Sequence, residues 1–92
     1  MIKIVNKKLL EVLNKKPYDC GSWDDSKLKK IRRKLLSFHR RSEREYPMSE
    51  WLSHDQADIG PHIMYVMWSH DLAEEIDREL MERGYSTDEY LI

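Results

Sequence analysis

The chain has few residues that cross-link a fold or interrupt a helix. Its 92 residues include one Cys, three Gly and three Pro. A lone Cys20 cannot form an internal disulfide, which is typical of proteins in a reducing cytoplasm, here that of a bacterial cell or a virus-infected host cell. The scarcity of Gly and Pro predicts long secondary-structure elements joined by few turns.

Long hydrophobic runs are also missing. The longest one, Ile63 to Trp68, is far shorter than the roughly 20 residues that a helix needs to span a bilayer. The N-terminus alternates charged and apolar residues, so it lacks the continuous apolar segment of a signal peptide. Because 40% of the residues are hydrophobic and 36% are charged, we expect one soluble domain over residues 1–92, with no linker and no membrane partner.

The sequence contains no clear metal-ligand pattern. His54, Asp58 and His62 are spaced by four residues, which would place all three on one face of a helix. The pair Gly60-Pro61 falls inside that spacing and is expected to break the helix. We therefore expect neither a metal site nor a cofactor.

Residues able to act as nucleophile, acid or base occur without an arrangement that would activate them. Cys20 and His39 could form a thiol–imidazole pair only if the fold brought them together, and no orienting group is evident. The carboxylates cluster on predicted helix surfaces, where such groups are usually solvated. No glycine-rich phosphate loop is present. The sequence thus predicts a protein that is not an enzyme.

Helical periodicity and capping residues predict an all-α fold, a compact bundle of about four helices. Asn6, either Ser22 or Asp24, and Ser49 can each cap a helix, and Pro61 suits the first position of another. The predicted helices span residues 7–16, 25–45, 49–58 and 61–83, and a short C-terminal turn follows.

The last predicted helix contains the one ambiguous segment. Ile63–Trp68 alone could form a buried strand, but no turn residue separates it from the helical pattern that follows, so a continuous helix is favoured. Gly84 stands where a left-handed residue commonly ends a helix, with Tyr85 available for the accompanying apolar contact. Ser86 and Glu89 have the spacing of a capping box for the final turn.

Positive charge is concentrated in the first half of the chain. Up to Tyr46 there are fourteen Lys and Arg against six Asp and Glu, a balance of +8; from Pro47 onward there are two against eleven, a balance of −9. Nine of the sixteen cations lie between residues 26 and 44. On a helical wheel the apolar stripe of this segment is Leu28, Ile31, Leu35 and Phe38, edged by Leu36, and the opposite arc is Lys29, Lys30, Arg33, Lys34, Arg40 and Arg41.

Three roles are open for this basic arc. It could bind nucleic-acid phosphates through counterion release, and its many lysines favour mostly non-specific contact. It could be a solvated face that the acidic last helix partly neutralises. It could also lie on an anionic membrane, although its apolar face suits a protein core better than a lipid anchor.

The start of the last helix carries apolar residues on more than one side. Tyr65 and Val66 continue the core stripe, whereas Met64, Met67 and Trp68 form a second apolar surface. Helix 49–58 and the loop 17–23 could cover that surface from within the chain. Alternatively it could dock another protein or a second copy in a homodimer, because methionine adapts to a partner and tryptophan is common among energetic anchors.

Two short segments resemble known DNA-binding families. The stretch "LSHDQADIGPHIMYV" resembles a helix-turn-helix, whose second helix here would be apolar and then acidic. The chain length and the closing "ELMERGY" are similar to the small all-α pyrimidine-dimer DNA glycosylases of phages. That resemblance implies a nucleophilic amine on a Thr exposed by Met removal, but residue 2 here is Ile2, so we expect the chemistry to be absent.

These observations favour a small non-catalytic interaction or regulatory protein of phage or mobile-element type. It would act by binding and occluding a partner macromolecule, either a protein or a nucleoprotein complex. The first alternative is a nucleic-acid-binding regulator that places the basic helix 26–44 on phosphates. The third hypothesis is an enzyme of the small DNA-glycosylase type that has lost its activity.

Overall fold

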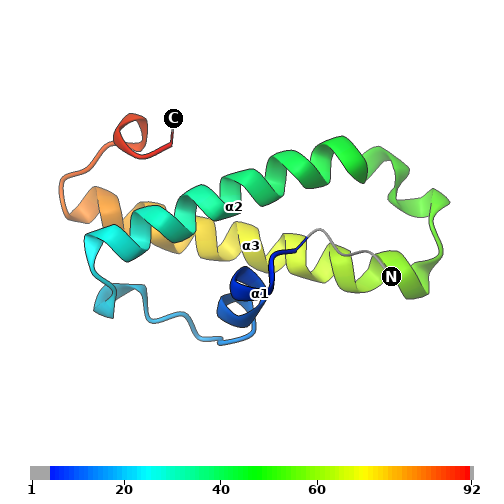
Figure 1. Cartoon of the computed structure of the whole chain (residues 1–92), viewed down its shortest axis with the longest axis horizontal. Helices are drawn as coiled ribbons and strands as arrows, with labels where there is room; N and C mark the ends of the chain where they lie inside the picture. The colour runs from blue at the N-terminus through cyan, green and yellow to red at the C-terminus, as the bar shows by residue number, and fades with distance from the viewer. Residues whose placement is uncertain (1–4, 92) are drawn as a thin grey trace.

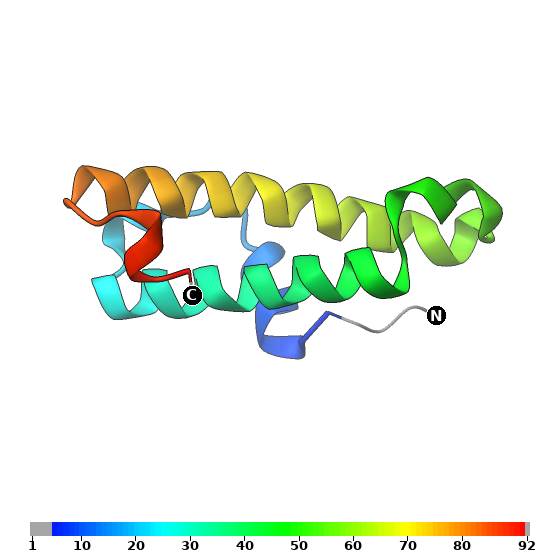
Figure 2. The same ribbon diagram turned by 90° about the horizontal axis from the view of Figure 1, so that it is seen from above.

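The computed structural model describes residues 5–91, and all of their regular structure is helical. Three α-helices, α1 (Lys7–Leu13), α2 (Asp25–Glu45) and α3 (Gln56–Glu82), alternate with the 3₁₀ turns η1 (Cys20–Ser22), η2 (Met48–Ser53) and η3 (Thr87–Glu89). The all-α prediction is therefore confirmed. In Figures 1 and 2, α2 and α3 lie side by side and antiparallel, and short α1 packs across them. The molecule is elongated, 43 × 25 × 17 Å.

The core lies where the apolar stripe of α2 meets that of α3. The predicted apolar stripe of α2 is buried, and the helix has the predicted bounds. At its start, Asp24 Oδ1 accepts a hydrogen bond of 2.7 Å from the Lys27 amide and caps the helix. The residues that meet are Leu28, Ile31, Leu35 and Phe38 from α2, and Val66, Leu72, Ala73, Ile76 and Leu80 from α3. α1 adds Leu9 and Leu13 to the same cluster.

Helix α1 is shorter than predicted, ending at Leu13 rather than at residue 16. Asn6 caps its start as expected, accepting from the Lys8 amide at 2.8 Å. Leu13 is its last buried residue, and the Asn14, Lys15 and Lys16 side chains that follow are exposed. Continuing the helix would therefore bury no further apolar surface. The Tyr18 hydroxyl instead donates to the Leu13 carbonyl at 2.7 Å and satisfies one terminal acceptor.

The predicted helix 49–58 is wrong. Its first part forms the 3₁₀ turn η2, in which the Trp51 indole N–H donates to the Tyr46 carbonyl at 2.8 Å and holds the turn against the end of α2. Its last part belongs to α3, which begins at Gln56. Asp55, not Ser49, is the N-cap that matters, because its side chain accepts from the Ala57 amide at 2.9 Å.

The Gly60-Pro61 pair does not break the helix, and α3 continues through it. Pro61 removes one amide donor from the second turn, at a cost of about 3 kcal/mol in a helix interior. On the same helix Ile59, His62 and Val66 are buried against the rest of the fold. A break would expose these three side chains, so their burial outweighs the preference of proline for a helix start.

The end of α3 agrees with the prediction. Gly84 has φ 94°, its amide donates to the Met81 carbonyl, and the Tyr85 amide donates to the Leu80 carbonyl, both at 3.0 Å. Two such bonds around a left-handed residue are the Schellman motif. The short C-terminal turn η3 follows, and buried Tyr90 returns the chain to the core.

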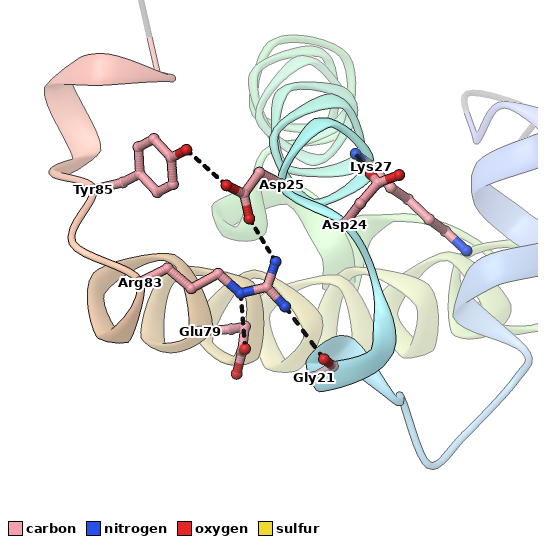
Figure 3. A network of polar contacts seen from close by, with 7 residues as sticks. All are labelled: Gly21, Asp24, Asp25, Lys27, Glu79, Arg83 and Tyr85. Atoms are coloured by element: carbon pink, nitrogen blue, oxygen red, sulfur yellow. Dashed lines mark hydrogen bonds and ion pairs between the residues drawn. The ribbon is translucent and has the colours of Figure 1, made fainter.

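A polar network fastens the start of α2 to the end of α3 (Figure 3). The Asp25 carboxylate accepts from Arg83 Nη1 and from the Tyr85 hydroxyl, each at 2.7 Å. Arg83 also donates to the Glu79 carboxylate at 3.0 Å and to the Gly21 carbonyl at 3.2 Å. The hydrogen bonds from Tyr85 and then Arg83 lower the pKa of Asp25. The network therefore joins η1, α2 and α3 at one end of the bundle.

Truncation of a buried α2 residue should destabilise the fold far more than truncation of a basic one. Leu35 is fully buried between the helices, so Leu35→Ala should lower the free energy of unfolding by about 2–4 kcal/mol. Arg33 is exposed on the same helix, and Arg33→Ala should change it by less than about 0.5 kcal/mol. Urea unfolding followed by circular dichroism measures both. Equal losses would mean that α2 packs by a different face.

Candidate nucleic-acid interface

The predicted basic arc lies on the side of α2 that faces away from α3. Lys30, Arg33, Arg40 and Arg41 are exposed, and Lys34 is half-buried. This orientation follows from the helical repeat: because the apolar stripe is fixed against α3, residues displaced by about half a turn must point outward. The structure thus presents most of the arc to solvent.

Four of the six predicted cations line one groove between α2 and the start of α1. The groove has a volume of about 420 Å³. Its walls are Asn6 and Leu9 from α1 and its cap, and Lys30, Arg33, Lys34, Ser37, Phe38 and Arg41 from α2. Phe38 is only 4% exposed, so the side chains that α2 presents to the groove are chiefly those of Lys, Arg and Ser. The tertiary placement of α1 converts part of a helix face into a concave site.

The acidic helix does not neutralise this groove. Among the described residues, Arg41 is the only cation of the arc in an ion pair, with Glu45 of its own helix at 3.4 Å. Both side chains of that pair are largely exposed, so the pair contributes little. The cations that α3 does pair are Arg32 with Asp77 at 2.9 Å, Arg83 with Glu79 at 3.0 Å and Lys16 with Asp71 at 3.5 Å. The arc therefore retains its positive field.

Two predicted arc residues lie outside the groove. Lys29 points toward the C-terminal segment, where its ammonium lies 3.7 Å from the centre of the Tyr85 ring. This cation–π contact fixes Lys29 away from the other cations. Arg40 belongs to the adjoining surface, which it shares with Arg41 and Arg44.

Sequence reasoning missed several residues around the groove. Ser37 and Asn6 line it, and exposed Lys7 and Lys8 belong to the turn of α1 that begins beside it. Ser37 could have been found, since it lies four residues before Arg41 and three after Lys34 on the wheel. The α1 residues could not, because nothing local indicates where α1 packs along α2.

The second predicted surface is divided by the structure. Met64 is 39% exposed and Met67 is 62% exposed, so neither η2 nor the loop around η1 covers them. Trp68 is half-buried: it packs edge-on against Tyr65 with ring centres 5.7 Å apart, and the Lys16 ammonium lies 5.2 Å from its ring. The interpretation of full cover from within the chain is therefore wrong for Met67.

The histidines form contacts between α2 and α3 rather than a metal site. Buried His62 shares a hydrogen bond of 2.9 Å with Ser42, and His39 shares one of 2.6 Å with Ser69. The His39 ring stacks on that of His70, with ring centres 4.2 Å apart. His54 lies outside α3, just after η2. Within residues 5–91 no group of three His, Cys, Asp or Glu could hold a metal ion.

The surroundings of the buried histidines and of Cys20 favour the uncharged forms of these side chains, which are less reactive. Burial lowers the pKa of His62, and burial with the nearby His70 and Arg32 lowers the pKa of His39 to about 4. Burial and the neighbouring carboxylates raise the pKa of the Cys20 thiol to about 11. Cys20 is thus a buried, protonated thiol near pH 7, whereas His39 bonds to Ser69 elsewhere in the fold. The thiol–imidazole pair does not form.

None of the protein-family models, curated proteins or solved structures compared with this chain matches it. Ile2, on which the glycosylase comparison depended, lies outside the described residues. No described helix combines the length and apolar character that a bilayer span requires.

Acid should destabilise the protein through the two interhelical histidines. The pKa values of His39 and His62 lie below the unfolded value of 6.5, so the unfolded chain binds protons first. The stability that the two neutral imidazoles contribute to the folded state is fully present above pH 6.5 and is lost as the pH falls toward 4. The free energy of unfolding should decrease by about 2 kcal/mol from pH 7 to 5 for His39 alone. Urea titrations at both pH values test this.

The matched variants separate the contribution of His39 from general acid effects. His39→Gln keeps a side-chain nitrogen near Ser69 and should reduce the loss between pH 7 and 5. His54→Gln removes a histidine outside the α2–α3 contact and should leave the loss unchanged. An equal loss of stability between pH 7 and 5 in the two variants would contradict the assignment of that loss to His39.

Proposed function

We propose that this chain is a small, non-catalytic regulatory protein that acts by binding and occluding a nucleic acid. The contact surface is the outer face of α2, with Lys30, Arg33, Lys34, Arg40 and Arg41. The observation that carries the proposal is that these side chains reach solvent together, while within residues 5–91 the only ion pair that any of them forms is the exposed one of Arg41.

Phosphates are the natural ligand of such a face. Each phosphate that a Lys or Arg neutralises releases condensed counterions, and this term supplies most of non-specific binding. Among residues 5–91, the face carries no exposed side chain that is well suited to adenine, such as Asn or Gln, apart from Asn6 at the groove edge, whose side-chain oxygen already caps α1. Binding should therefore depend on backbone charge far more than on sequence.

The remaining surface favours occlusion over bridging. The outer side of α3 carries exposed Asp71, Glu74 and Glu82, which repel a second nucleic-acid segment. One copy therefore engages one segment, along a long axis of 43 Å. At 3.4 Å per base pair this length covers about 12 base pairs of duplex. A protein bound in this way excludes other proteins from the covered stretch.

The side-chain chemistry supports a role without catalysis. The Cys20 thiol is buried with a raised pKa, and His39 and His62 are held in interhelical hydrogen bonds. A free thiol suits the reducing cytoplasm of a bacterial or virus-infected cell. A small regulator of phage or mobile-element type, expected from the sequence, would work in that compartment.

Affinity for nucleic acid should fall steeply with salt. With four to five phosphate contacts, the slope of log K against log salt should be about −4 for duplex DNA. Fluorescence anisotropy with a 20-base-pair labelled duplex between about 50 and 200 mM salt measures it. The double variant Arg33→Glu/Arg40→Glu should abolish binding at about 100 mM salt while leaving the circular dichroism spectrum unchanged. Absence of binding by the unmodified protein at about 50 mM salt would refute the proposal.

A second candidate function is docking of a protein, a nucleoprotein complex or a second copy through Met64, Met67 and the edge of Trp68. The exposure of Met67, at 62%, favours it. Large apolar side chains grouped on a surface commonly mark interaction sites. This surface lies on α3, away from the basic face, so both contacts could form on one molecule.

A charged residue in place of Met67 should prevent docking at this surface without unfolding the protein. Because Met67 is exposed, Met67→Glu should leave the thermal unfolding curve almost unchanged. Size-exclusion chromatography with light scattering should then show a loss of any dimer formed by the unmodified chain, because a carboxylate would be buried unpaired. Met81→Glu, at another exposed methionine of α3, is the control. An unchanged dimer would exclude Met67 from the contact.

A further inference from the structure

The groove between α1 and α2 indicates more about the ligand than the charge of α2 alone. It has two walls of different chemistry: α2 supplies the cations Lys30, Arg33 and Arg41, and α1 with its cap supplies Asn6 and Leu9. A flat basic face would contact one side of an anion. A groove with a row of cations along one wall and a second wall opposite suits an anionic strand that lies against the cations.

The length of the groove agrees with a nucleic-acid strand. Lys30 and Arg41 lie eleven residues apart on one helix, which corresponds to about 16 Å at 1.5 Å per residue. One strand of a duplex carries a phosphate about every 3.4 Å of helix axis. Because the strand winds around that axis, its successive phosphates are further apart than this rise, and the wall of α2 is long enough to contact more than one of them. A single free phosphate or a mononucleotide would use only a fraction of it.

The lining residues favour a duplex over a single strand. Proteins that bind single strands combine a positive groove with exposed aromatic side chains on which bases stack. In the part of the chain that the structure describes, the only aromatic residue lining the groove is Phe38, and it is 4% exposed because it belongs to the core. A duplex keeps its bases stacked internally and needs no such surface. Ser37, exposed between the cations, can donate a hydrogen bond to a phosphate oxygen.

We infer that the groove lined by Lys30, Arg33, Lys34, Ser37 and Arg41 receives one strand of the sugar–phosphate backbone of a double-stranded nucleic acid. This inference rests on the proposed function and specifies its ligand. α1 and its cap serve as the second wall, through Asn6 and Leu9. Recognition is of backbone shape and charge.

The first experiment compares how tightly the whole chain binds two nucleic acids. A labelled 20-base-pair duplex and a mixed-sequence single strand with the same total number of phosphates are titrated at about 100 mM salt. The duplex should bind at least about tenfold more tightly, because the groove offers no stacking surface to unpaired bases. Equal or tighter binding of the single strand would overturn the inference while leaving the proposed function intact.

The second experiment tests the groove with matched variants. Ser37→Glu adds a carboxylate to the groove and should weaken duplex binding by about tenfold or more, whereas the neutral Ser37→Gln should change it less than about threefold. Lys34→Glu should weaken binding strongly. Lys15→Glu changes the net charge equally, but Lys15 follows α1 and does not line the groove, so its effect should be small.

The outcomes distinguish the two proposals. Loss of binding in Ser37→Glu and Lys34→Glu, with folding unchanged by circular dichroism, supports the groove. Normal duplex binding by both variants, with loss in Arg40→Glu, would overturn the groove and retain the basic face. Equal effects of Lys34→Glu and Lys15→Glu would also overturn it, since only net charge would matter. Binding of neither nucleic acid at about 50 mM salt would refute both proposals.

Discussion

The antiparallel contact between α2 and α3 is the interaction on which the rest of the structure depends. Each helix buries one stripe against the other, and leucines such as Leu28, Leu35, Leu72 and Leu80 are fully buried there. A chain of this size has little stability in reserve. The same contact also fixes the rotation of both helices about their axes. It therefore determines which side chains of α2 can reach solvent.

Polar interactions set the register of that contact at several points along its length. The Asp25, Arg83 and Tyr85 network holds one end. Nearer the middle, the Asp77 carboxylate accepts from both Arg32 Nε at 2.9 Å and the Tyr90 hydroxyl at 2.8 Å. Apolar stripes alone would tolerate a shift along the helix axes, but directional bonds do not. The histidine–serine bonds add two further fixed points in the second half of α2.

Much of the fold could be predicted from local signals. Asp24 and the apolar repeat gave α2 its bounds, and Gly84 gave α3 its end, because capping is decided within a few residues. The errors arose where distant packing outweighs local preference. Pro61 predicts a helix start, yet the burial of Ile59 and His62 carries the helix through it. The cations of the candidate site could be assigned to one arc, but the groove could not, since it depends on where α1 packs.

Opposite charges lie on the two outer sides of the α2–α3 pair, and this separation affects how the molecule rotates near other charged molecules. Cations project from the outer side of α2, and exposed carboxylates such as Asp71, Glu74 and Glu82 project from the outer side of α3. With a net charge of only −1, the molecule acts chiefly as an electric dipole directed across the helix pair. Within about one Debye length, roughly 10 Å at 0.1 M salt, a polyanion exerts a torque on this dipole. A polyanion at that distance would turn the basic side toward itself before any side chain makes contact, and the oriented dipole would then be attracted although the chain carries almost no net charge.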